Sequence, residues 1–183
     1  MGKLDGKVAF ITGAARGQGR SHALKLAEEG ADIIAVDICS QIASVEYDMA
    51  TPEDLDETVR LVEALDRRIF AQQADVRDLA ALEKAVKEGE VAIGPIDIIL
   101  ANAGIAPLGL SGDREQPFAD VVDVNLTGVY NTVMAAVPSL ITKQAGSIVL
   151  TSSTQGLKGT GGNGGAGGTG YAAAKHGVVG LMR

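Results

Sequence analysis

The sequence KVAFITGAARGQG, residues 7–19, joins a short apolar run to three glycines in a G-x-x-x-G-x-G spacing. Such a run predicts a buried strand, and the residues after it, from about Gln18 to Glu29, have the pattern of an amphipathic helix. Glycine lets the backbone turn tightly and approach a pyrophosphate, whose charge faces the amides at the start of the following helix. A strand, a glycine turn and a helix in this order predict a dinucleotide-binding unit.

The same alternation of strand and helix continues through the rest of the chain. One helix start is well marked, because Thr51 can act as N-cap, Pro52 takes the first helical position and Asp54 lies in the first turn. The expected strands are 7–12, 32–36, 69–75, 96–101 and 146–152, and the expected later helices are 52–66, 79–88 and 118–141. Strands separated by helices imply right-handed crossovers and a parallel sheet. The sequence therefore predicts an α/β fold, a Rossmann-type doubly wound parallel sheet, in a single domain spanning residues 1–183.

Two segments interrupt this pattern. Residues 38–50 lie between the second strand and its helix and exceed the two to six residues usual for such connections. We expect this insertion to act as a lid. Residues 159–170, GTGGNGGAGGTG, contain eight glycines in twelve positions. We expect a loop at the mouth of the active site, with a flexible linker as the alternative.

Composition excludes several classes of protein. The 183 residues, 46% of them hydrophobic, suffice for one substantial core. A net charge of -7 argues against a nucleic-acid partner, and no apolar run approaches the roughly 20 residues of a membrane span. The apolar stretch near the N-terminus is too short for a signal peptide. A single cysteine, Cys39, suits a reducing cytoplasm, and with only His22 and His176 beside it a zinc cluster is not expected.

A carboxylate after the second strand strengthens the dinucleotide interpretation. Asp37 stands eighteen residues after Gly19, where an acid would bind the hydroxyls of the adenosine ribose. Arg16 points to the other cofactor, because a guanidinium in the glycine loop can hold a 2'-phosphate. The Asp37 carboxylate should repel that phosphate at close range. We therefore expect NAD, with NADP as the less favoured alternative.

Tyr171 and Lys175 stand four residues apart near the end of the chain. On a helix these positions share a face, so the Lys175 ammonium can lie beside the phenol and favour its ionised form. A free phenol has a pKa of about 10, and bringing it near neutrality takes roughly 4 kcal/mol of differential stabilisation. A nearby ammonium and a cationic nicotinamide could supply it. This pair therefore predicts a hydride-transfer site.

Five motifs in order carry a resemblance to a known family. They are TGAARGQG at 12–19, ANAG at 101–104, Asn125, the serine pair before Gly156, and YAAAK at 171–175. Together they resemble the short-chain dehydrogenase/reductases over nearly the whole chain. The segments 7–23 and 152–162 and the long stretch after Asp37 further resemble the mycofactocin-associated, carveol-dehydrogenase-like branch of actinobacteria.

The resemblance implies a division of labour among the site residues. Tyr171 would be the general acid/base, Ser153 would hydrogen-bond the substrate oxygen, and Lys175 would bind the nicotinamide ribose. Asn125 would anchor a water that links Lys175 to solvent. The residues expected to contact the cofactor are Gly13, Arg16, Gly17, Gln18, Gly19, Asp37, Ile38, Asp75, Val76, Asn102, Ala103, Gly104, Tyr171 and Lys175.

The same resemblance implies the substrate and partners. It implies an apolar, terpenoid-like secondary alcohol or ketone and a tightly held nicotinamide that a peptide-derived redox cofactor reoxidises. A protein of family length would be a homotetramer. An epimerase or dehydratase of the extended branch is less favoured, because its G-x-x-G-x-x-G motif and larger substrate domain are not present.

Several residues have a simpler alternative. Ser152 competes with Ser153, although only Ser153 stands three residues before Gly156, as the family pattern implies. Asn125 could be a structural amide satisfied by neighbouring backbone. His176 is expected to pack or be solvated, and Cys39 to be a small buried hydrophobe. A solvated face rather than a metal site is expected for the acids Glu46, Asp48, Glu53, Asp54, Asp56 and Glu57.

The position of Lys175 near the last residue, Arg183, favours a second hypothesis. The family would continue with a sixth strand, a substrate-covering helix pair and a seventh strand used in tetramer assembly. Without them the fifth strand would be an uncovered edge, and the last helix would be about three turns short. The alternative function is therefore a truncated, non-catalytic NAD-binding module.

Overall fold

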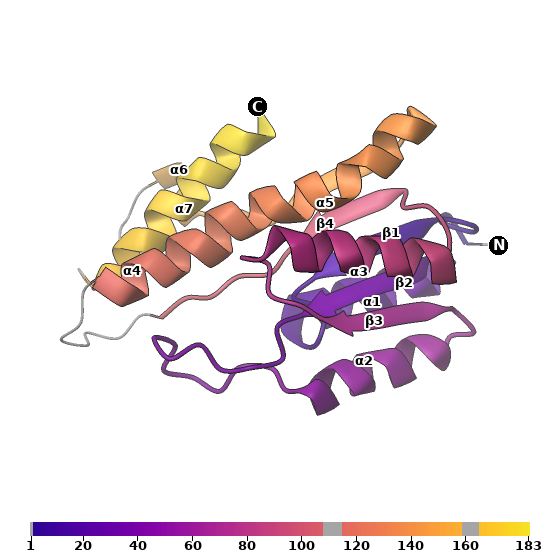
Figure 1. The fold of residues 1–183 in the computed structure, drawn as a ribbon, viewed down its shortest axis with the longest axis horizontal. Coiled ribbons are helices and arrows are strands. Elements are labelled where there is room, and N and C mark those ends of the chain that lie inside the picture. The colour runs from indigo at the N-terminus through magenta and orange to yellow at the C-terminus, as the bar shows by residue number, and fades with distance from the viewer. Residues whose placement is uncertain (1, 108–114, 159–164) are drawn as a thin grey trace.

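A five-stranded parallel sheet forms the centre of the molecule (Figure 1). The structure, a computed structural model, describes residues 2–107, 115–158 and 165–183. The strands are β1 (Val8–Thr12), β2 (Asp32–Asp37), β3 (Ile69–Gln73), β4 (Ile98–Ala101) and β5 (Ser147–Leu150). Their order is β3-β2-β1-β4-β5, with every neighbouring pair parallel. The predicted doubly wound sheet is confirmed, and its order reverses between β1 and β4, where ligands bind in such folds.

Helices cover both faces of this sheet (Figure 1). They are α1 (Gly17–Glu28), α2 (Pro52–Glu63), α3 (Leu79–Ala92), α4 (Glu115–Val122), α5 (Gly128–Lys143), α6 (Gln155–Lys158) and α7 (Ala166–Met182). Buried residues of α1 and α2 form one core cluster with one face of the sheet, and those of α3 and α5 form another with the opposite face. The expected start of α2 is confirmed as a capping box between Thr51 and Asp54.

The central strands alternate between these two clusters. On β1, Phe10 belongs to the α3 and α5 side, whereas Ala9 and Ile11 belong to the α1 and α2 side. All three are fully buried. A strand whose side chains are buried on both faces needs an unbroken apolar run, which is why residues 8–11 were recognisable in the sequence.

One long helical segment, Glu115–Lys143, runs along the sheet on the α3 side. It was predicted as a single helix over 118–141, but a π-helical turn, Asp123–Thr127, separates α4 from α5. Such a turn accommodates an extra residue and is frequent at functional sites. By length and composition the segment could cross a membrane, but half of its most apolar window is buried inside the molecule, and core helices of water-soluble proteins pass the same test.

The glycine-rich segment differs from the expected loop. Residues 159–164 lie outside the described part of the chain, and α7 begins at Ala166. The prediction of a loop is therefore wrong for residues 166–170. A Cβ on Gly167 would overlap the carbonyl oxygen of Pro107, and one on Gly170 would lie 3.2 Å from the Phe118 carbonyl oxygen. These glycines let α7 pack closely against α4 and the chain before it.

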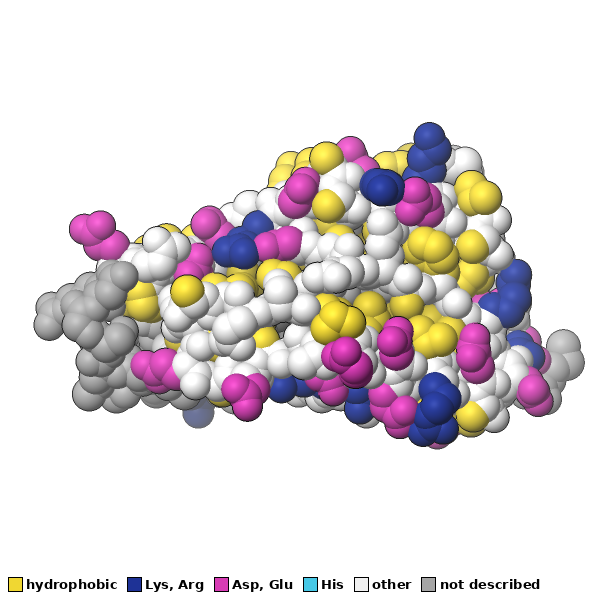
Figure 2. Space-filling model, turned by 60° about the horizontal axis from the view of Figure 1, so that its bottom comes forward, with side chains coloured by type: hydrophobic (Ala, Val, Ile, Leu, Met, Phe, Trp, Pro, Cys, Tyr) yellow, Lys and Arg dark blue, Asp and Glu magenta, His cyan; other side chains and the backbone are white. Residues whose placement is uncertain are grey.

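The fifth strand lies at an edge of the described sheet, as expected. Ser147, Ile148 and Val149 are all exposed, in contrast to the buried residues of β1. Figure 2 shows another face of the molecule, on which acidic and basic side chains are interspersed among hydrophobic ones. Charge of a single sign does not dominate that face.

Candidate active site

A cavity of about 280 Å³ opens at the carboxyl ends of the strands, beside the point where the strand order reverses. Its walls come from the loops after β1, β2, β3 and β4. Eleven of the residues expected to contact a cofactor line it: Gly13, Arg16, Gly17, Gln18, Asp37, Ile38, Asp75, Val76, Asn102, Ala103 and Gly104. The structure thus brings together residues as far apart in the sequence as Gly13 and Gly104.

The glycines after β1 differ in what they contribute. Gly13 and Gly17 have φ angles of +71° and +57°, in the left-handed region that favours glycine. Gly13 also lies close to the loop after β4, because a Cβ there would be 2.8 Å from the Cα of Ala103. Gly19 does not line the cavity. Its added Cβ would overlap the carbonyl oxygen of Gly13, so Gly19 lets α1 begin directly against the loop.

Asp37 ends β2 with its carboxylate at the cavity wall. One oxygen, Oδ2, accepts from the amide of Ala15 at 3.0 Å, and the other, Oδ1, accepts from the amide of Cys39 at 3.2 Å. Each carboxylate oxygen can accept more than one hydrogen bond. The carboxylate is therefore held in one orientation while it retains acceptor capacity for a ligand hydroxyl. Arg16 lines the same cavity and is exposed.

The insertion 38–50 supplies cavity residues that were not predicted individually. Besides Ile38, which was predicted, four of its residues belong to the wall: Ile42, Tyr47, Met49 and Ala50. The Tyr47 hydroxyl accepts from the amide of Ala106 at 3.0 Å, which joins the insertion to the chain after β4. The Ser44 hydroxyl donates to Asp120 Oδ2 at 2.6 Å, which joins it to α4. The length of the insertion was the only sequence signal, and it did not indicate which side chains point inward.

Asp75 and Val76 border the cavity after β3. The guanidinium of Arg77 donates to Asp75 Oδ2 at 2.6 and 2.9 Å and to Asp75 Oδ1 at 3.1 Å, and it reaches Asp120 at 3.3 Å. The hydrogen bond to Asp75 raises the pKa of Arg77 above its ordinary value. This ion-pair group fixes the wall next to the insertion, since Asp120 also binds Ser44.

Tyr171 and Lys175 lie one turn apart on α7, as the four-residue spacing predicted. The Lys175 Nζ lies 5.5 Å from the centroid of the Tyr171 ring. Lys175 is only 3% exposed and donates to the carbonyl oxygen of Thr151 at 2.7 Å. Burial lowers its pKa to about 8, because the charged form loses hydration.

Gly104 and Asn125 connect this pair to the cavity. A Cβ on Gly104, which lines the cavity, would lie 3.3 Å from Asn125 Oδ1 and 3.8 Å from Lys175 Nζ. Lys175 and Asn125 therefore lie at the end of the cavity formed by the loop after β4. Tyr171 and Lys175 do not themselves line the cavity.

Asn125 lies in the π-helical turn and is fully buried. Its Oδ1 accepts from the Ile105 amide at 2.8 Å, and its Nδ2 donates to the Ile105 carbonyl at 2.8 Å. The side chain thus holds the loop after β4 against the long helix. This agrees with the alternative that Asn125 is a structural amide bonded to neighbouring backbone. The expected role of Asn125 in anchoring a water stays a prediction. Such a water would have to bind the second lone pair of Oδ1 or the second hydrogen of Nδ2.

The two serines have different partners. Ser152 donates to the carbonyl oxygen of Lys175 at 3.0 Å, which ties β5 to α7. Ser153 accepts from the Gln155 amide at 3.2 Å, so its hydroxyl hydrogen is available for another acceptor. This difference favours Ser153 as the serine that faces a substrate. The assignment remains a prediction.

His176 and Cys39, the remaining candidates for a chemical role, have surroundings that do not favour one. His176 is exposed, with Nδ1 2.9 Å from the carbonyl oxygen of Ala172. Burial and the neighbouring Asp37 raise the pKa of the Cys39 thiol to about 12, which disfavours the reactive thiolate. Within residues 2–107, 115–158 and 165–183, no three His, Cys, Asp or Glu residues are arranged to hold a metal ion.

The fold and the cavity define an α/β domain of the Rossmann type, with a tyrosine and lysine pair near the end of its cavity. The family model described as short chain dehydrogenase matches residues 7–183. The chain belongs to the short-chain dehydrogenase family, whose members are oxidoreductases.

Individual relatives agree with this assignment. The chain is 50% identical to a (-)-trans-carveol dehydrogenase from Rhodococcus erythropolis, covering 100% of this chain and 65% of that one. It is 54% identical to a carveol dehydrogenase from Mycobacterium avium solved in complex with NAD, with a TM-score of 0.92 over 100% of this chain and 65% of the other. A short chain dehydrogenase from Mycobacterium paratuberculosis bound to NAD is 52% identical, with a TM-score of 0.92 over 98% and 66%. The chain therefore spans about 65% of the length of these carveol dehydrogenases.

Proposed function

We propose that this chain is an NAD-dependent oxidoreductase that transfers a hydride between a nicotinamide and a secondary alcohol or its ketone. The observation that carries the proposal is that the cavity and the tyrosine and lysine pair adjoin each other. The cavity beside Asp37 extends to Gly104, and Gly104 lies next to Lys175, which shares a helix face with Tyr171. A dinucleotide in this cavity would have its adenosine ribose at Asp37 and its nicotinamide near α7.

The proposed chemistry assigns one task to each side chain. The cavity residues would hold NAD, whose oxidised nicotinamide would supply the acceptor for the hydride that leaves the carbinol carbon. Tyr171, as phenolate, takes the hydroxyl proton of the alcohol in the same step, and returns it when a ketone is reduced. Ser153 donates a hydrogen bond to the reacting oxygen and holds it beside Tyr171. This assignment rests on the free hydroxyl hydrogen of Ser153.

Lys175 is proposed to supply charge and a route for the proton. Its ammonium, 5.5 Å from the Tyr171 ring centroid, lies within the range over which a cation stabilises a nearby phenolate. It would also bind the nicotinamide ribose. Because burial sets its pKa to about 8, Lys175 can exchange a proton near neutral pH. A water at Asn125 completes the route to solvent.

The proposed substrate follows the likeness to the carveol dehydrogenases. We propose an apolar, terpenoid-like alcohol. NAD is preferred over NADP because the fixed Asp37 carboxylate would repel a 2'-phosphate. The insertion 38–50, which lines the cavity, would retain the nicotinamide cofactor, and a peptide-derived redox cofactor of the mycofactocin type would reoxidise it. The protein of family length works as a cytoplasmic homotetramer.

A second candidate function is a non-catalytic NAD-binding module. One contrast favours it: described residues wall the cofactor cavity, whereas three of the four residues of β5, next to the serines, are exposed. Such a module would bind NADH with the affinity of an enzyme but turn over no alcohol. Appending the C-terminal segment of a carveol dehydrogenase relative would restore turnover if only a substrate wall is lacking.

The test compares the chain with its Tyr171→Phe variant. With carveol-like alcohols and NAD, the chain should form NADH, and the variant should lose about 10²- to 10⁴-fold in rate while it binds NADH unchanged. Full activity in the variant would remove the mechanism. NADH binding without turnover in the unmodified chain would select the non-catalytic module.

A further inference from the structure

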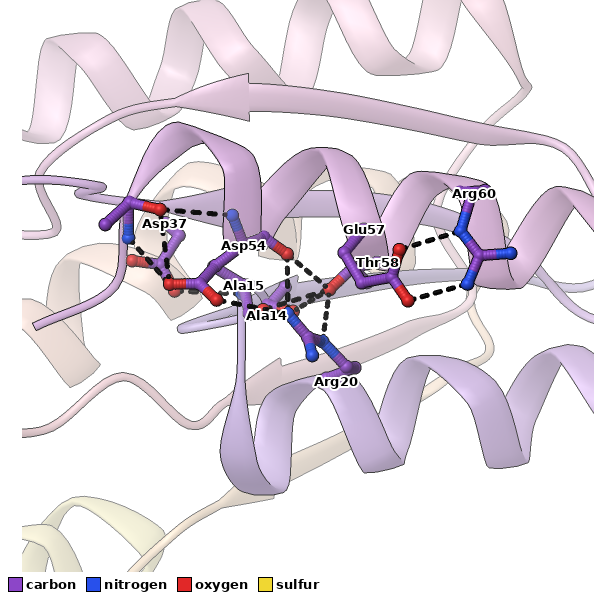
Figure 3. A network of polar contacts seen from close by, with 9 residues as sticks. Ala14, Ala15, Arg20, Asp37, Asp54, Glu57, Thr58 and Arg60 are labelled. Carbon is purple, nitrogen blue, oxygen red and sulfur yellow. Dashed lines mark hydrogen bonds and ion pairs between the residues drawn. The ribbon is translucent and has the colours of Figure 1, made fainter.

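Two side chains outside the cavity wall gather around the carbonyls of the glycine loop (Figure 3). Thr58 of α2 is fully buried, with its hydroxyl oxygen 3.1 Å from the carbonyl oxygens of both Ala14 and Ala15. Arg20 of α1 donates from Nη2 to Ala15 at 2.5 Å and to the Asp54 carbonyl at 2.7 Å. Its Nε donates to the Thr58 oxygen at 3.0 Å. Arg20 and Thr58 thus tie α1, α2 and the glycine loop together.

The hydroxyl of Thr58 has a single hydrogen to donate. Arg20 occupies the Thr58 oxygen as a donor, and Arg20 already supplies a hydrogen bond to the Ala15 carbonyl. The Asp54 carbonyl, 3.3 Å from the Thr58 hydroxyl, also accepts from Arg20. The Thr58 hydrogen is therefore available for the carbonyl of Ala14, which is nearer, at 3.1 Å. We assign this carbonyl as its main acceptor.

The Ala14 carbonyl is one end of a peptide unit whose other end holds Asp37. The Ala15 amide of that unit donates to Asp37 Oδ2 at 3.0 Å. Because a peptide is planar and trans, its C=O and N–H point in opposite directions, so fixing one fixes the other. Contacts thus run from Arg20 through Thr58 and the peptide to the carboxylate (Figure 3).

We propose that Thr58, oriented by Arg20, is a positioning residue that sets the preference for NAD over NADP by holding the Ala14–Ala15 peptide and, through it, the carboxylate of Asp37. The inference rests on the proposed function, in which Asp37 binds the adenosine ribose. A fixed carboxylate accepts from the ribose hydroxyls and repels a 2'-phosphate. A carboxylate that is free to rotate binds the ribose hydroxyls less tightly and repels a 2'-phosphate less strongly. Arg16 at the same cavity can then bind the 2'-phosphate of NADP.

The variant Thr58→Val removes the hydroxyl and keeps the branched shape. We expect its affinity for NADH to fall about tenfold, as for the loss of one oriented hydrogen bond. Its affinity for NADPH should stay the same or rise, so the NADH to NADPH affinity ratio falls at least about tenfold. Thr58→Ser, which keeps the hydroxyl, should restore the ratio.

A matched control is Thr132→Val on α5. Thr132 is also fully buried, and its hydroxyl donates to the Gly128 carbonyl at 2.7 Å, away from the glycine loop. This variant should lose stability, as Thr58→Val does, without a change in the affinity ratio. A ratio that falls equally in both variants would show a general effect of destabilisation and overturn the proposal.

The decisive measurement is a double-mutant cycle with Asp37→Ala, in which both cofactors are titrated against the full chain and its variants. If Thr58 acts through Asp37, Thr58→Val changes the ratio no further in the Asp37→Ala background. The same change in both backgrounds, or an unchanged ratio in Thr58→Val alone, would overturn the inference. If Thr58→Val does not fold, Arg20→Lys decides by the same criterion, because one ammonium cannot replace the fork that contacts Thr58 and two carbonyls. An unmodified chain that fails to bind NADH, or prefers NADPH, would instead contradict the proposed function.

Discussion

Two glycine-rich segments serve the two halves of the site, and they use glycine for different reasons. In residues 12–19 the glycines at 13 and 17 adopt positive φ angles and form the turn beside the cavity. In residues 159–170 the described glycines from Gly167 onward are helical, and their missing side chains let α7 approach Pro107 and Phe118. Glycine content alone therefore predicts neither a turn nor a loop, since close packing of a helix requires the same residue.

The largest effect is expected for Gly19→Ala, at a glycine next to the turn that is needed for close packing and not for a positive φ angle. A Cβ there would overlap the carbonyl oxygen of Gly13, where the rigid backbone of the turn cannot move away easily. We expect a loss of about 3 kcal/mol in stability and a roughly hundredfold loss in NADH affinity. Thermal unfolding and NADH titration measure the two. A variant that folds and binds NADH normally would show that α1 does not need the close contact between Gly19 and the Gly13 carbonyl.

The next effect concerns the buried charge in the catalytic half. Burial lowers the pKa of Lys175 from 10.5 to about 8, so between these values the unfolded chain binds more protons than the folded one. The free energy of unfolding should therefore rise with pH across this window, by about 2 kcal/mol more than in Lys175→Met. Denaturant titrations of both proteins between pH 8 and 10.5 measure the difference. Parallel pH curves would place the Lys175 ammonium in contact with solvent.

A smaller and more selective effect is expected for Gly167→Ala. Its Cβ would push α7 away from the Pro107 carbonyl, at a cost of about 2 kcal/mol. Because α7 carries Tyr171, turnover should fall about tenfold or more, while NADH binding, to which α7 adds only the contacts of Tyr171 and Lys175, should fall less. Equal losses of turnover and NADH binding would contradict the separation between the two glycine segments.

The smallest effect has the opposite sign. Gly180 lies on the same helix as Gly167, but an added Cβ would meet nothing within 4 Å. Gly180→Ala should therefore stabilise the protein by roughly 0.5–1 kcal/mol through helix propensity, with turnover unchanged. A destabilised Gly180→Ala variant would mean that α7 packs against something at this position in solution.

Sequence reasoning recovered the features that depend on local chemistry. Short sequence patterns were enough to predict the strand at 8–12, the helix cap at Thr51 and the shared helix of Tyr171 and Lys175. The π-helical turn at Asn125 was not predicted, because an extra residue in a helix leaves no mark in hydrophobic periodicity. The helical start of α7 was missed, because the contacts of Gly167 with Pro107 depend on tertiary packing.

The candidate site was predictable to a similar degree. The motifs named most of the cavity wall, since strand ends and glycine turns place residues at one edge of a parallel sheet. They did not name Tyr47 or Met49, whose inward direction depends on the path of the insertion. They also did not indicate Thr58 and Arg20, which contact the carbonyls of the glycine loop from outside the cavity wall.

The central claim is that hydride passes directly between the substrate carbon and the nicotinamide while Tyr171 moves the proton. The most direct measurement uses a secondary alcohol with deuterium on its carbinol carbon, one equivalent of NAD bound to the chain, and mass spectrometry of the released cofactor. The account predicts one deuterium in the NADH formed by the unmodified chain and almost none from Tyr171→Phe. Reduced cofactor without deuterium, or equal labelling in the two proteins, would contradict it.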